Sequence, residues 1–118
     1  MFTIALFILS LVDCAPHRMR KAVGEEFTID LVSNPSTGYS WYIKDYDKEA
    51  KHDNDAVVLV NEKFLSSYEA STLDGSPSKQ LFTFLARANG EQTLVLEYKR
   101  AWETVEPLKT ESYIIVVQ

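Results

Sequence analysis

Cysteine is nearly missing from this chain, because Cys14 is the only one among its 118 residues. It follows an apolar run over residues 4–12, which is shorter than the ~20 residues needed to span a membrane but has the length of a signal-peptide core. No Lys or Arg precedes the run, so a first β-strand is the alternative. We expect residues 1–14 to be a signal peptide and the mature domain, residues 15–118, to start near Ala15. That domain would contain no disulfide and no thiol.

Basic residues are also in short supply. Lys and Arg number 12 against 17 Asp and Glu, which leaves a net charge of −5 at pH 7. A nucleic-acid-binding domain needs a concentrated basic face, and here the basic residues are scattered apart from Arg18, Arg20 and Lys21. The charge balance therefore argues against nucleic acid as a partner. Hydrophobic residues still make up 46% of the chain, so we expect one domain with a real core.

Residues for common catalytic chemistry are sparse as well. The two histidines are His17, which we expect in a flexible N-terminal segment, and His52, which we expect in a polar loop. Neither has an obvious Ser or Asp partner in the sequence, and two isolated histidines do not make a zinc site. The four glycines form no phosphate-binding cluster, and no G-x-S-x-G motif is present. We therefore expect neither an enzyme nor a bound cofactor.

Two acidic segments come closest to a chemical site. Residues 45–49 start like a calcium-binding loop, but Ala50 stands where the loop requires Gly and Ala56 where it requires Glu. Glu103 and Glu106 could act as a pair of carboxylates, although nothing in the sequence places them in a pocket. We therefore expect a solvated acidic loop at residues 45–49 and no metal ion.

Apolar runs of strand length recur along the rest of the chain. In residues 27–31 apolar side chains alternate with polar ones, which is the period-two pattern of a half-buried strand. Asn89-Gly90 is a hairpin signal, and the polar residues 44–55 are expected to form a surface loop. Short strands separated by turns predict an all-β sandwich or barrel. The further strands are expected at residues 39–43, 57–60 with a continuation or separate piece at 64–65, 81–85, 93–98 and 113–117.

A stiff polar turn runs directly into an aromatic segment at residues 34–41. Pro35 fixes its own φ and holds Asn34 extended, while Gly38 permits a backbone conformation that other residues resist. Ser36 and Thr37 are left at the loop tip, where their hydroxyls and amides can meet a partner. An ordinary loop between two strands is the alternative interpretation.

A second feature follows the strand expected at residues 93–98. Arg100 and Trp102 are residue types that dominate interface hot spots, because one offers planar donors and the other a large apolar face. The alternative places Trp102 in the core and leaves Arg100 as an isolated surface charge.

Three short segments, taken in order, resemble the chagasin family of cysteine-peptidase inhibitors. They are Asn34-Pro35-Ser36-Thr37-Gly38, Asp74-Gly75-Ser76-Pro77 and Arg100-Ala101-Trp102. The similarity extends to residues 22–25, 39–42 and 80–84, so it covers nearly all of the mature chain. The chain departs from the family in two places: Ala101 replaces a proline, and residues 75–78 replace adjacent glycines.

The resemblance implies an immunoglobulin-like β-sandwich of about seven or eight strands with three loops at one end. Those loops would bind papain-like cysteine peptidases reversibly and tightly without being cut. Ser36 and Thr37 would lie nearest the catalytic thiol. Gly75 and its neighbours would flank one side of the cleft, and Arg100 and Trp102 the other.

The same resemblance implies papain-like peptidases as partners, with cathepsin-L-like enzymes as the expected targets. A monomer is the default expectation for the oligomeric state. The predicted signal peptide implies the secretory pathway. The protein would be secreted, or held in a lysosome-like or phagosome-like lumen, or be periplasmic in a bacterium. An immunoglobulin-like adhesion or carbohydrate-binding module is the alternative function, in which these loops would be ordinary turns.

Overall fold

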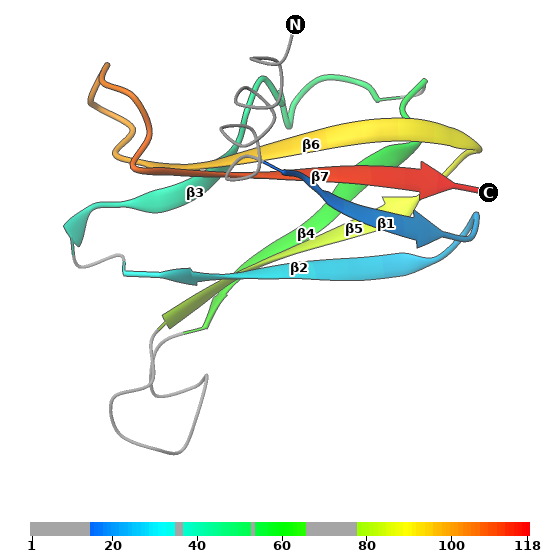
Figure 1. Ribbon diagram of the computed structural model, residues 1–118, viewed down its shortest axis with the longest axis horizontal. Helices are drawn as coiled ribbons and strands as arrows, with labels where there is room; N and C mark the ends of the chain where they lie inside the picture. The colour runs from blue at the N-terminus through cyan, green and yellow to red at the C-terminus, as the bar shows by residue number, and fades with distance from the viewer. Residues whose placement is uncertain (1–14, 35–36, 53, 66–77) are drawn as a thin grey trace, which may run out of the picture.

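A computed structural model describes residues 15–118 apart from residues 35–36, 53 and 66–77 (Figure 1). The signal peptide predicted at residues 1–14 lies outside this described part. The described residues form seven β-strands in two sheets, ordered β1-β7-β6-β3 and β2-β5-β4. Among them, no helix is long and apolar enough to cross a membrane. The strands are β1 (His17–Lys21), β2 (Glu26–Ser33), β3 (Ser40–Ile43), β4 (Val57–Leu65), β5 (Ser78–Ala86), β6 (Gly90–Lys99) and β7 (Lys109–Val117).

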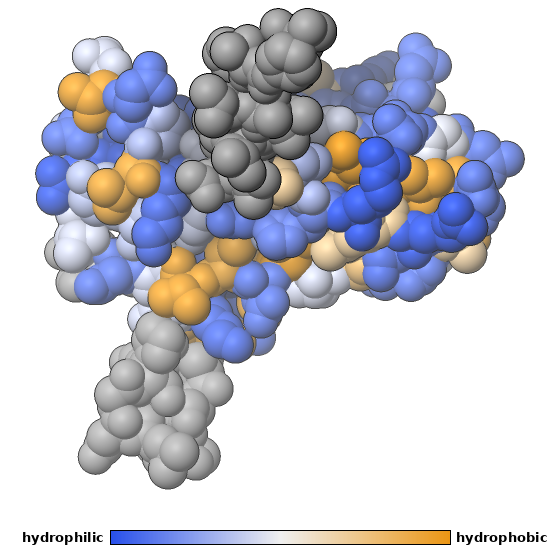
Figure 2. Space-filling model, in the orientation of Figure 1, coloured by the Kyte–Doolittle hydropathy of each residue, from blue (hydrophilic) through white to orange (hydrophobic). Residues whose placement is uncertain are grey.

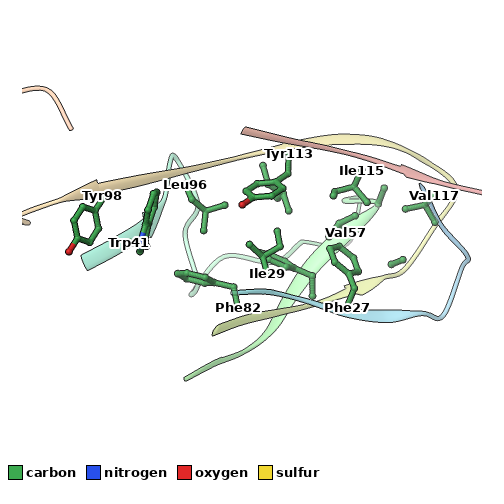
Figure 3. Close-up of a cluster of buried hydrophobic side chains, with 14 residues drawn as sticks. Phe27, Ile29, Trp41, Val57, Phe82, Leu96, Tyr98, Tyr113, Ile115 and Val117 are labelled. Carbon is green, nitrogen blue, oxygen red and sulfur yellow. The ribbon is translucent and has the colours of Figure 1, made fainter. Parts of the chain in front are cut away.

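The core lies between the two sheets and follows the alternation of the strands. Polar side chains cover much of the outer surface in Figure 2, while apolar ones from both sheets meet inside (Figure 3). In β5, for example, Phe82 and Phe84 are fully buried in this core. Figure 3 shows Phe82 across the core from Leu96 of β6 and Ile115 of β7. Burial of such side chains stabilises each by about 1.5–3 kcal/mol, which makes this interlayer core the main source of stability. The all-β prediction is confirmed.

Most predicted strands occur where the periodicity placed them, and the hairpin at Asn89-Gly90 joins β5 to β6 as expected. Phe64 and Leu65 continue β4, which carries an irregularity in its pairing between Leu59 and Asn61. Strand β7 begins at Lys109, four residues before the apolar run, because its polar start pairs with the end of β6.

Strand β1 was not expected, and the prediction of a flexible segment around His17 is wrong. This strand pairs in parallel with β7, and His17 lies opposite Tyr113. The His17 ring stacks on Tyr113 with centroids 4.7 Å apart, and its Nε2 lies 2.7 Å from Oε1 of Glu111. The segment shows no apolar alternation, so its own sequence does not indicate a strand. Its ladder partner and ring contact come from residues almost a hundred positions away.

A buried glutamine links the two sheets next to the end of β3. Gln80 of β5 is almost completely buried, and its Oε1 accepts a hydrogen bond from the backbone N–H of Trp41 at 2.9 Å. Its Nε2 donates to the backbone oxygen of Trp41 at 2.8 Å. The indole N–H of Trp41 donates to the backbone oxygen of Val32 at 2.9 Å. Since β3 is the edge of its sheet, Gln80 supplies the partners that a further strand would otherwise provide.

We predict that Gln80→Met lowers the free energy of unfolding by about 3 kcal/mol, because it leaves two buried backbone groups of Trp41 without partners. Chemical denaturation measures this change. Lys79→Met is the matched control, since Lys79 precedes Gln80 on the same strand and its ammonium group makes an exposed ion pair with Asp30, 3.3 Å away. That control should change stability by less than about 1 kcal/mol. Equal stability of the two variants would contradict the prediction.

The polar segment between β3 and β4 forms turns at the surface, as expected, but it is organised around His52. The His52 ring stacks on Tyr46 with centroids 4.4 Å apart, and the Tyr46 hydroxyl accepts a hydrogen bond from the N–H of Leu59. Nε2 of His52 lies 2.7 Å from the backbone oxygen of Asp47, and Nδ1 lies 2.7 Å from Oδ2 of Asp55. The expectation that His52 lacks an acidic partner is therefore wrong. Both partners only accept hydrogen bonds, so both are satisfied only by the doubly protonated ring.

We predict that His52 titrates above its ordinary value of about 6.5. The backbone oxygen of Asp47, followed by the carboxylate of Asp55, raises the pKa of His52, because both stabilise the imidazolium. The resulting stabilisation is complete below the ordinary pKa and is lost as pH rises through the higher folded-state pKa. NMR titration of the His52 ring measures this value. Asp55→Asn should lower the pKa, and a ring that titrates below 6.5 in the unmodified protein would refute the assignment.

Candidate functional site

Two loops singled out in the sequence lie at the same end of the sandwich, on the left in Figure 1. The central loop, residues 34–38, joins β2 to β3, and the β6–β7 loop, residues 100–108, follows Lys99. They are neighbours because Ser40 pairs with Lys99 at the end of the β3–β6 ladder. Ser78, which starts β5, pairs with Ser33 and so lies at this end as well. Of the predicted site residues, Pro35, Ser36, Asp74, Gly75, Ser76 and Pro77 lie outside the described part of the chain.

Hydrogen bonds within the central loop and beneath it hold its two described sides in place. The N–H and hydroxyl of Thr37 both donate to the backbone oxygen of Asn34, at 3.1 and 2.7 Å. The N–H of Asn34 donates to the hydroxyl of Tyr98 at 3.0 Å. The side chains of Asn34 and Thr37 remain exposed. Asn34 and Thr37 are thus tied to each other, and Asn34 is anchored to a buried tyrosine.

Trp102 lies directly against the end of the central loop. Gly38 has a φ of +84°, and a Cβ built on it would lie 2.5 Å from Cη2 of Trp102. Any side chain at this position would therefore both strain the backbone and displace the indole. Trp102 is 70% exposed, so the alternative that placed it in the core is wrong. The ring instead forms one surface with the central loop.

Arg100 joins the same two loops through its guanidinium group. Its Nε donates to the backbone oxygen of Thr37 at 3.1 Å, and its Cζ lies 4.4 Å from the centroid of the Tyr39 ring. Its Nη1 lies 3.4 Å from Oε2 of Glu103. The alternative that left Arg100 as an isolated surface charge is therefore wrong. Arg100 is half-buried and positions the central loop relative to the β6–β7 loop.

An aromatic layer supports both loops from below. Tyr98 is buried near the end of β6, and its ring centroid lies 5.3 Å from that of Tyr39. It lies 5.1 Å from that of Trp41, beside it in Figure 3. Sequence reasoning missed the supporting roles of Tyr39, Tyr98 and Glu103. A signal for Tyr39 existed, because it directly follows the motif. Nothing in the sequence showed that the hydroxyl of Tyr98 reaches the amide of residue 34.

Ala101 is exposed, and the β6–β7 loop takes a defined turn without a proline there. The N–H of Glu103 donates to the backbone oxygen of Arg100 at 3.1 Å, and the N–H of Leu108 donates to that of Tyr98 at 2.8 Å. These bonds close the loop at both ends. Within the described part of the chain, no three His, Cys, Asp or Glu side chains gather closely enough to hold a metal ion. The arrangement offers a preorganised contact surface rather than a reactive group.

Comparisons with known proteins identify the class of molecule that carries this surface. The family model described as Chagasin family peptidase inhibitor I42 matches residues 21–117. Chagasin of Trypanosoma cruzi is 35% identical over 81 residues, covering 69% of this chain and 70% of chagasin. Amoebiasin-2 of Entamoeba histolytica is 31% identical over 91 residues, covering 76% of this chain and 68% of its own.

Solved structures agree with the sequence matches. A crystal structure of a cysteine protease inhibitor from Entamoeba histolytica superposes with a TM-score of 0.69 at 28% identity, covering 87% of this chain and 88% of the other. A solved structure described as Leishmania mexicana ICP, with a TM-score of 0.61 and 24% identity over 87% of this chain and 89% of the other, supports the fold alone. The expected immunoglobulin-like β-sandwich is confirmed. The chain belongs to the chagasin family of peptidase inhibitors.

Proposed function

We propose that this protein is a reversible, tight-binding inhibitor of papain-like cysteine peptidases and that the joined loops form its binding surface. The observation that carries the proposal is the contact of Trp102 with Gly38, which makes one surface of two loops distant in sequence. In this surface, Asn34 to Gly38 enter the active-site cleft, with Ser36 and Thr37 nearest the catalytic thiol. Arg100, Ala101 and Trp102 lie along one side of the cleft, and Asp74 to Pro77 lie along the other.

The physical basis of inhibition is a loop that is held in shape before it binds. Association normally loses the conformational freedom of interface loops, and a preorganised loop avoids much of that loss. Here the turn at Thr37, the anchor on Tyr98 and the guanidinium of Arg100 fix the described sides of the central loop. A wedge that fills the cleft without presenting a scissile carbonyl to the thiol blocks the enzyme and is not cut. Family membership disfavours the adhesion or carbohydrate-binding alternative.

The finer assignments belong to the same proposal. Cathepsin-L-like peptidases are the proposed targets, and a monomer is the proposed active form, because each copy carries both described loops. We also propose that residues 1–14 are removed as a signal peptide and that residues 15–118 act in the secretory pathway or a lumen it supplies. The apolar run before Cys14 motivates this assignment. Intact-mass measurement of the protein secreted by its producer tests the cleavage, and size-exclusion chromatography with light scattering tests the monomer.

Titration of the purified protein against papain and a cathepsin-L-like enzyme tests the central proposal. We expect complete inhibition at nanomolar concentrations, since protease–inhibitor complexes are among the tightest known. The inhibitor should be recovered uncut after prolonged incubation, as mass spectrometry would show. A serine peptidase such as trypsin is the control and should keep its activity. No inhibition of either cysteine peptidase at micromolar concentration would refute the proposal.

Two glycine substitutions separate the binding surface from folding. Gly38→Ala should weaken inhibition about a hundredfold, because the new methyl group pushes Trp102 off the central loop and removes a hot-spot contact. Gly24→Ala is the matched control: its φ of +93° resembles that of Gly38, but a Cβ there has no atom within 4 Å. Both variants should lose similar stability, about 1–2 kcal/mol, from left-handed backbone strain.

Inhibition assays and thermal unfolding of the two glycine variants together show whether a loss of inhibition comes from the binding surface or from lower stability. Retention of full inhibition by Gly38→Ala would show that the Trp102 contact is irrelevant to binding. Loss of inhibition in Gly24→Ala would show that general destabilisation, and not the surface, explains the effect.

A further inference from the structure

Exposed apolar side chains continue past Trp102 along the β6–β7 loop. Val105 is 68% exposed and Leu108 is 60% exposed, so both show most of their surface to solvent. Together with Trp102 they place three large hydrophobic residues on a stretch of seven. Single exposed apolar residues are ordinary, but such a concentration on one loop marks an interaction surface. We call Val105 and Leu108 the apolar extension. Figure 2 shows apolar surface at the left end, where this loop lies in Figure 1.

The loop that carries the apolar extension is fixed at both ends. The N–H of Leu108 bonds to the backbone oxygen of Tyr98, directly across the base of the loop, at 2.8 Å. At the other end, Glu103 bonds through its N–H to the backbone oxygen of Arg100 and through its carboxylate to the Arg100 guanidinium. A fixed loop presents its apolar side chains at little entropic cost when a partner arrives.

The apolar extension is continuous with the site already described. Val105 and Leu108 share a small recess of about 50 Å³ with Tyr39 and Arg100, the two residues whose contact supports the central loop. Lys99, Glu103 and Glu106 complete the lining of this recess. A partner bound to Trp102 and the central loop would therefore meet Val105 and Leu108 next, at the edge of the same surface.

We propose that Val105 and Leu108 contact an apolar surface of the inhibited peptidase outside its active-site cleft and help to set which peptidases are bound tightly. This inference rests on the proposed inhibitory function. The central loop and Trp102 contact the active-site cleft, which papain-like enzymes share. The apolar extension contacts the surface beside the cleft, where one peptidase can differ from another. Apolar contact at that place requires a matching apolar patch on the enzyme, because a polar surface would gain nothing from covering Val105 and Leu108.

The test compares inhibition constants and dissociation rates for the wild-type protein and the double variant Val105→Ser/Leu108→Ser. Several papain-like peptidases are assayed in parallel. For the most tightly bound enzyme we expect the inhibition constant to rise about tenfold or more, mainly through faster dissociation. For weakly bound enzymes the inhibition constant should rise less. The ratio between the inhibition constants of weakly and tightly bound enzymes should therefore become smaller.

Three controls accompany the double variant. Val23→Ser removes a similarly exposed valine, 52% exposed, from the turn between β1 and β2 and should leave inhibition unchanged. Val105→Ile/Leu108→Met keeps the surface apolar and should retain wild-type inhibition. Thermal unfolding should be alike for all variants, since the substituted side chains are exposed. A serine variant that is destabilised would be replaced by Val105→Thr/Leu108→Thr, for which the same loss of inhibition is expected.

Each remaining outcome has a distinct meaning. Wild-type protein that inhibits no cysteine peptidase overturns the proposed function and this inference with it. Wild-type protein that inhibits, together with a serine double variant within twofold of it on every enzyme, overturns this inference alone. A wild-type dimer that the serine double variant converts to a monomer, with inhibition unchanged, would assign the apolar extension to self-association and also overturn it.

Discussion

Two hydrogen bonds between the Gln80 side chain and the backbone of Trp41 join the two sheets at the end that carries the loops. They hold the edge strand β3 against β5, and Tyr98 of β6 packs on the Trp41 ring they position. Tyr98 in turn accepts the hydrogen bond that anchors Asn34. Because the side chains of Gln80, Trp41 and Tyr98 are buried and mutually dependent, the core restrains the central loop in addition to the hydrogen bonds that Thr37 makes to Asn34.

The two loops are joined to each other mainly through backbone atoms. Arg100 bonds to the carbonyl of Thr37, and Trp102 packs on Gly38, which has no side chain. The contact between the two loops therefore depends on the backbone shape of the central loop more than on the identity of its tip residues. The ion pair between Arg100 and Glu103 and the turn that joins them restrain the β6–β7 loop on both sides of Ala101. Arg100 thereby acts as a positioning residue within the inhibitor.

The histidines show why some features were out of reach of sequence reasoning. His17 lies in a strand because its segment pairs with β7, and the residues next to it in the sequence do not indicate this pairing. His52 has its carboxylate partner only three residues away, but the contact depends on turns that bring Asp55 to one ring nitrogen and a backbone oxygen to the other. The sequence spacing alone does not distinguish such a turn from any other polar loop. The core strands could be predicted because alternating apolar and polar residues directly indicate one buried and one exposed face.

By itself, the sequence determined every sheet-forming segment except β1, the inward face of the alternating segment at residues 27–31, and the loop motifs at residues 34–38 and 100–102, because alternation, glycine and proline act over a few residues. It also carried the family resemblance. Only the tertiary structure decided which sheet each strand joins, that Trp102 is exposed against Gly38, and that Arg100 and Tyr98 hold the central loop. The physical reason is distance along the chain. These contacts join residues about sixty positions apart, and they exist only once the two layers have packed and brought the ends of β2, β3 and β6 together.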